Sequence, residues 1–130
     1  MSFIKFKDVG RKSSSFVSIT NSQSFGFGAD FLQQHNLLDK NYIELFYDSE
    51  EQKIAFYFKD TPEKGSTFKL IGQEGGSRSI VARSFFTKFL RDFKPEQYES
   101  RYKPEKVEDV SHGTLYVIQL KQKQAETPEN

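Results

Sequence analysis

Few residues of this chain have the type and spacing that catalysis or metal binding requires. His35 and His112 are the two histidines, 77 positions apart, and cysteine is absent. A zinc site needs three or four converging ligands, which neither histidine has at a ligand spacing. The serines at 13–15 lack a recognisable base, and the acidic run at 48–51 lacks the glycine and the bidentate glutamate of a calcium loop. The sequence therefore predicts no enzymatic activity, no metal site and no cofactor.

Two glycines in the segment GFGADF, Gly26 and Gly28, raise the possibility of a phosphate-binding loop. The dinucleotide-binding pattern needs a third glycine, and the P-loop needs a following Gly-Lys-Ser/Thr; this segment has neither. Glycines that alternate with Phe25 and Phe27 instead indicate a strand that packs closely against another backbone.

The basic residues are segregated along the chain, and they carry the main binding signal. The net charge is only +1, but residues 1–20 hold four bases and one acid, and residues 76–103 hold seven bases and three acids. The intervening residues 21–75 hold five bases and nine acids. If the two basic blocks converge on one face, they form a positive surface that attracts a polyanion. The candidate phosphate contacts are Arg11, Lys12, Arg78, Arg83, Lys88 and Arg91.

A second candidate surface is aromatic and contains Tyr42, Phe46 and Tyr57. Strand periodicity places these residues opposite the core-facing positions of two neighbouring strands. With Lys53 and Lys59 nearby, they could stack on unpaired bases. Burial, or an interface in a homo-oligomer, is the reading we favour for them.

The elements that must position these residues are mostly strands. Alternation of apolar and polar residues predicts strands at 3–7, 16–20, 25–28, 42–48, 53–59, 67–73, 78–82 and 114–121, with a further strand near 101–103 or 107–110. Helical spacing of apolar residues predicts short helices at 29–38 and 83–93, the second amphipathic with Phe85, Phe89 and Leu90 on one side. The clearest element is a hairpin, because the polar turn SEEQ joins two strands of alternating pattern.

The order of these elements predicts a tandem ββαββ repeat with units at 16–58 and 67–120. One such unit is too small to bury its own faces, so we expect a single domain over 1–120 and a disordered tail at 121–130. The predicted fold is α+β and mainly β: two units form a small barrel or interlocked sheet with two short helices. An undivided α+β sandwich is the alternative.

The stretch from residue 17 to residue 46 resembles the AbrB/MraZ group of swapped-hairpin β-barrel proteins. VSITNSQSFGF followed by ADFLQQHNLLDKNYIELFYD is similar in order and spacing to that family's unit, which runs (V)xITxxGxxxIP, a short helix and LGIxxGDxVxF. Ser22, Gly28 and Asn41 stand near the family's usual turn glycine, proline and Gly-Asp turn. The resemblance implies DNA binding through basic residues in loops, often by a symmetric oligomer, and the tandem arrangement is more like MraZ.

These observations predict a non-enzymatic nucleic-acid-binding protein, with DNA a better candidate than RNA, in the role of a transcriptional regulator. The alternative is a protein-interaction or assembly module that oligomerises through the aromatic hairpin at 42–58. A ligand pocket in the barrel mouth is a third, weaker hypothesis. The chain has no apolar run of the length that a membrane span or signal peptide needs, and no cysteine, so we expect a cytoplasmic protein without a membrane partner.

Overall fold

The computed structural model describes residue 3 and residues 15–72 and 75–123 of the chain. Predictions that fall outside these ranges are the strand at 3–7 beyond Phe3, the phosphate contacts Arg11 and Lys12, and residues 124–130 of the predicted tail.

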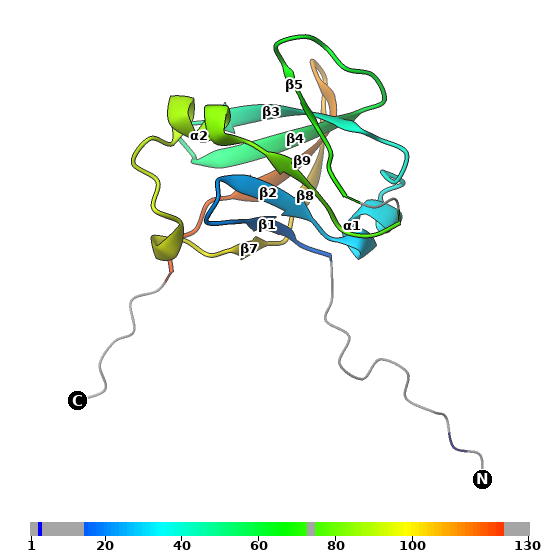
Figure 1. Ribbon diagram of the computed structural model, residues 1–130, viewed down its shortest axis with the longest axis horizontal. Helices are drawn as coiled ribbons and strands as arrows, with labels where there is room; N and C mark the ends of the chain where they lie inside the picture. The colour runs from blue at the N-terminus through cyan, green and yellow to red at the C-terminus, as the bar shows by residue number, and fades with distance from the viewer. Residues whose placement is uncertain (1–2, 4–14, 73–74, 124–130) are drawn as a thin grey trace.

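Strands and two short helices follow one another in the predicted order (Figure 1). The elements are β1 (Val17–Ile19), β2 (Ser24–Phe27), α1 (Ala29–Gln34), β3 (Tyr42–Asp48), β4 (Lys53–Lys59), β5 (Thr67–Lys69), β6 (Arg78–Val81), α2 (Arg83–Phe89), the 3-10 helix η1 (Pro95–Gln97), β7 (Arg101–Tyr102), β8 (Glu105–Asp109) and β9 (Gly113–Gln119). The predicted hairpin strands are confirmed to the residue as β3 and β4. Both α-helices begin where predicted but end several residues earlier.

The described strands form two antiparallel sheets, which confirms the mainly β, α+β class. A four-stranded sheet has the order β6-β2-β1-β7, and a five-stranded sheet has the order β5-β3-β4-β9-β8. These sheets do not close into the barrel that we considered. At one edge, β5 and β6 belong to different sheets and are joined by the isolated bridge between Ile71 and Ser79. At the other edge, the bridge between Tyr98 and Gln122 is also isolated, so no continuous ladder of hydrogen bonds runs around the fold among the described residues.

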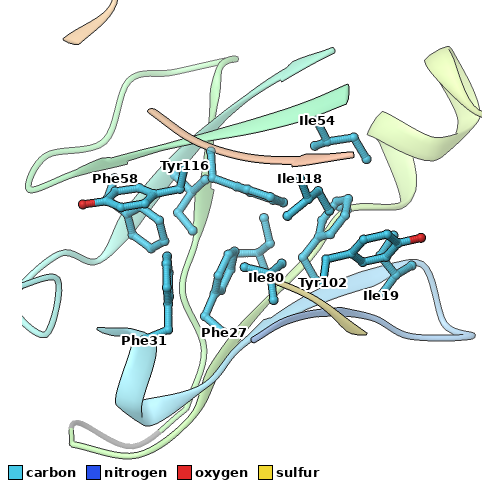
Figure 2. Packing of buried hydrophobic residues seen from close by; sticks show 14 of the residues in the cluster. Ile19, Phe27, Phe31, Ile54, Phe58, Ile80, Tyr102, Tyr116 and Ile118 are labelled. Carbon is cyan, nitrogen blue, oxygen red and sulfur yellow. The ribbon is translucent and has the colours of Figure 1, made fainter. Parts of the chain in front are cut away.

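The core lies between the two sheets, which pack face to face. Phe25 and Phe27 of β2 meet Phe56 of β4 edge-on, with ring centroids 5.0 and 5.2 Å apart, and Phe27 also meets Phe58 at 5.2 Å. These are favourable geometries for aromatic pairs. Figure 2 shows residues of the two sheets facing each other: Ile19, Phe27, Ile80 and Tyr102 on one side and Ile54, Phe58, Tyr116 and Ile118 on the other.

The two helices cover opposite ends of this core (Figure 1). On α1, Phe31 packs edge-on against Tyr116 with ring centroids 5.2 Å apart. On α2, Phe86 stacks on Phe25 at 5.3 Å. The short helices therefore cover the open ends of the sandwich and exclude water from its aromatic interior.

Gly26 leaves room for the Ser18 side chain of the neighbouring strand, whereas its spacing predicted close packing against a backbone. It pairs with Ser18 of β1, and a Cβ atom at Gly26 would lie 2.6 Å from the Ser18 hydroxyl oxygen. This segment is thus a strand of the core, as predicted.

Candidate nucleic-acid interface

Three of the predicted phosphate contacts lie on or just after α2. The helix buries Phe85 and Phe86, and this anchoring leaves Arg83 and Lys88 exposed to solvent. Arg91 follows the end of the helix and is also exposed. The structure therefore brings Arg83, Lys88 and Arg91 together on one element and its C-terminal extension.

Arg78 is placed differently from the other candidates. Its side chain is buried at 9% relative exposure. One terminal nitrogen donates to the Lys40 carbonyl at 2.9 Å, and the other donates to the Asn41 side-chain oxygen and the Leu70 carbonyl, both at 3.2 Å. The guanidinium therefore ties β6 to two connecting segments, and in this position it is not accessible to a phosphate.

The exposed bases of α2 continue into a larger basic side of the molecule, which we define as residues 83–100 and 121–123. Figure 1 shows α2, η1 and the C-terminal end of the described chain along one side of the fold. Backbone hydrogen bonds join the two segments: the Lys123 amide donates to the Gln97 carbonyl and the Glu99 amide to the Lys121 carbonyl, each at 2.8 Å. The basic side holds six bases and three acids, which gives it a local positive charge in a nearly neutral chain.

Three lysines elsewhere in the described ranges are paired with nearby acids, whereas Lys64, Lys69 and Lys106 are in no ion pair with a described residue. Lys40 pairs with Asp60 at 2.8 Å and Lys53 with Glu51 at 3.0 Å. Lys59 lies 3.0 Å from Glu63 and 3.1 Å from Glu44. Hydrogen bonds to Glu63 and then to Glu44 raise the pKa of Lys59. Among the described residues, no ion pair includes a base of the basic side, so those cations remain available to a partner.

The aromatic candidates lie where strand periodicity placed them, on the outer face of the five-stranded sheet. Tyr42, Phe46 and Tyr57 are half-buried, opposite the core-facing side chains of β3 and β4. The turn between β8 and β9 folds over this face: the His112 and Phe46 rings are 4.6 Å apart. Gly113 has a φ of +89°, and a Cβ there would lie 3.4 Å from a ring carbon of Tyr57. The chain's own turn thus covers part of this surface.

A groove beside α2 contains a residue that the sequence did not identify as functional. Helical spacing assigned Phe89 to the buried side of the helix together with Phe85, but Phe89 is 46% exposed. It lines a groove of about 380 Å³, the α2 groove, between α2, β3 and the segment that leads into β5. Tyr47 packs behind Phe89, with ring centroids 5.5 Å apart. Burial is the main cause that raises the pKa of Tyr47, and the charges of Tyr98 and Asp48 raise it further. No periodicity in the sequence could distinguish an exposed Phe89 from a buried one.

A second depression of about 340 Å³ lies beside α1 and is lined by His35, Lys40, Tyr57, Lys106, Thr114 and Tyr116 among others. His35 packs against Phe31 and Tyr116, with ring centroids 5.0 and 4.9 Å away. Burial, and then the positive charge of Lys106, lower the pKa of His35. These contacts show that His35 packs against the aromatic side chains at the end of the core that α1 covers.

No family model, curated protein or solved structure matches this chain. Over the described ranges, there is no cluster of three or more histidine, cysteine or acidic side chains able to hold a metal ion. Neither helix in that part of the chain is long and apolar enough to cross a membrane.

Proposed function

We propose that the chain binds nucleic acid through the basic side, with Arg83, Lys88 and Arg91 among the phosphate contacts. The observation that carries this proposal is the density of exposed bases on one side of the molecule. Residues 83–100 and 121–123 hold six exposed bases and three acids, and none of these bases has a carboxylate partner among the described residues. Unpaired cations gathered on one side are what phosphate neutralisation requires.

The proposal predicts binding that weakens steeply with salt. Fluorescence anisotropy of labelled oligonucleotides should detect binding at about 50 mM salt and its loss near about 200 mM. The triple variant Arg83→Gln, Lys88→Gln, Arg91→Gln should bind more weakly. Its slope of log affinity against log salt should be smaller by about 0.7 to 0.9 for each phosphate contact removed.

A matched control removes three ion-paired charges outside the basic side: Lys40→Gln, Lys53→Gln, Lys59→Gln. These side chains take part in surface ion pairs, which contribute little to stability, so the control should fold and bind nucleic acid like the parent chain. Absence of binding to any strand or duplex at low salt would refute the proposal. An equal loss in both triple variants would place the interface elsewhere.

The tandem repeat and the AbrB/MraZ resemblance belong to the same proposal. The element orders β1-β2-α1-β3-β4 and β5-β6-α2-β8-β9 are equivalent, with η1 and β7 as an insertion. Corresponding strands pair antiparallel between the halves: β2 with β6, and β4 with β9. A twofold relation between two duplicated units would place corresponding strands in this way, as the swapped-hairpin family implies.

Assembly through the aromatic hairpin is the second candidate. An apolar depression of about 460 Å³ on the outer sheet face, lined by Phe46, Ala55, Leu115 and Val117 among others, favours it. Ala55 and Leu115 are already buried in the monomer, however, and the turn at His112 covers part of the face. A stable oligomer in light scattering, together with no nucleic-acid binding at low salt, would favour assembly over the first candidate.

A further inference from the structure

The α2 groove lies where the edge of the five-stranded sheet is incomplete. β5 pairs with β3 only from Tyr42 to Glu44. Beyond Glu44, no described strand covers β3 on that side. α2 lies there instead, and its Phe85 and Phe89 rings are 6.1 and 5.5 Å from the ring of Tyr47. A short strand beside a short helix leaves an open space between the two elements.

The lining of this groove combines aromatic side chains with an unpaired cation. Its side chains include Phe46, Phe68, Phe85, Phe89, Lys88, Ser66 and Ser84. The one acid in the lining, Glu44, is already paired with Lys59 at 3.1 Å. Lys88 is the charged lining residue with no ion pair to a described residue. The volume of about 380 Å³ falls within the roughly 300–1,000 Å³ of small-ligand pockets.

Phe89 is exposed in the way that a stacking residue must be. Nearly half of its surface faces solvent, and the Lys88 ammonium nitrogen lies 5.5 Å from its ring centroid. Proteins that bind single strands combine aromatic surfaces, on which bases stack, with cations that contact the phosphates. The bases of an intact duplex are already stacked on one another and cannot occupy such a groove without being flipped out.

We propose that the α2 groove binds an unpaired nucleobase stacked on Phe89, so that the nucleic acid held by the basic side is single-stranded. This inference rests on the proposed function and specifies its ligand. The charge around the groove selects a polyanion over an uncharged or basic peptide, because Arg83 and Arg91 stand at the two ends of α2 without ion pairs to described residues.

The test compares a labelled single strand of about 15 nucleotides with a duplex of the same sequence, on the full chain, by fluorescence anisotropy. Phe89→Leu should weaken single-strand binding about tenfold and leave duplex binding within about twofold. Phe89→Tyr should retain the single-strand affinity, because it keeps the ring. Val81→Ala, which truncates another half-exposed apolar residue, should change neither affinity. Thermal unfolding of each variant verifies that it is folded.

The outcomes separate this inference from the proposed function. If wild type binds strands and Phe89→Leu changes nothing, the groove is not a base site, although the basic side still binds nucleic acid. If the parent chain binds neither probe at low salt, both proposals fail. If it binds no nucleic acid but forms an oligomer that Phe89→Leu dissociates, the groove is an interface between copies, and the inference is overturned.

Discussion

Arg78 shows how one side chain can be used by the fold instead of by a ligand. It lies in a block of bases along the sequence, and nothing in its neighbours separates it from Arg83. Its burial depends on two connecting segments: the bridge between Ile71 and Ser79 holds one of them beside β6, and the Leu70 amide donates to the Asn41 carbonyl of the other. Long-range contacts of this kind cannot be predicted from local composition. The charge pattern therefore indicates where a basic region lies, but not which of its bases are exposed to a ligand.

Replacement of Arg78 should therefore affect stability more than binding. Arg78→Ala leaves the Lys40 and Leu70 carbonyls without their donor, and we expect the free energy of unfolding to fall by about 2–4 kcal/mol. Arg83→Ala, at an exposed site, should change it by less than about 0.5 kcal/mol. Urea denaturation measures both. If Arg78→Ala keeps full stability and loses nucleic-acid binding, Arg78 is a phosphate contact after all.

His35 should make stability fall below neutral pH. Its ordinary pKa is 6.5, and burial and Lys106 lower the folded-state value. As the pH drops through 6.5, the unfolded chain takes up the proton first, so protonation favours unfolding. The wild type should therefore lose more unfolding free energy between pH 7.5 and pH 5.5 than His35→Gln, as measured by urea denaturation at both values. Equal losses in the two proteins would exclude His35 as the group responsible.

At the scale of elements, boundaries were predictable where local chemistry sets them. The turn between β3 and β4 is closed by the Asp48 carboxylate, which accepts hydrogen bonds from the Glu50 and Glu51 amides at 3.0 and 3.2 Å. A polar SEEQ turn between alternating strands signals this arrangement. The outer and inner faces of both strands followed from the same alternation.

Other boundaries depend on single residues or on tertiary contacts that periodicity does not reveal. α1 ends at Gln34 because Asn36 adopts a left-handed conformation with a φ of +57°, a common helix terminator. α2 ends at Phe89, and Phe93 then stacks on Tyr98 of the η1 segment, with ring centroids 4.4 Å apart. The apolar spacing continued through both positions and predicted longer helices. It also gave no reason to expect Phe89 at a groove.

At the scale of the whole molecule, the sequence predicted the order of elements but not which strands pair in each of the two sheets. Apolar periodicity shows which face of a strand is buried, not which strand is its neighbour. The pairs β2 with β6 and β4 with β9 join residues more than 50 positions apart. Whether these pairs close into a barrel depends on the edges at Ile71 and Tyr98, where isolated bridges stand in place of full ladders.

The two halves of the chain are interlocked, because strands of one half pair with strands of the other in both sheets. We therefore expect that neither half folds alone as a monomer. Fragments 1–62 and 63–130, cut in the loop between β4 and β5, each lose strand partners in both sheets. Phe25, Phe27 and Phe56 would then be exposed on open sheet faces. Circular dichroism should show no cooperative melting for either fragment as a monomer, and an equimolar mixture should recover the β-sheet spectrum and a single transition.

The same fragments test the duplication. Because corresponding strands pair antiparallel, a true repeat allows fragment 1–62 to form a symmetric dimer in which β2 pairs with β2 and β4 with β4 of a second copy. Size-exclusion chromatography with light scattering distinguishes such a dimer from an unfolded chain. A folded monomer of either fragment would contradict the interlocked architecture, because one half would then bury its aromatic face without the other.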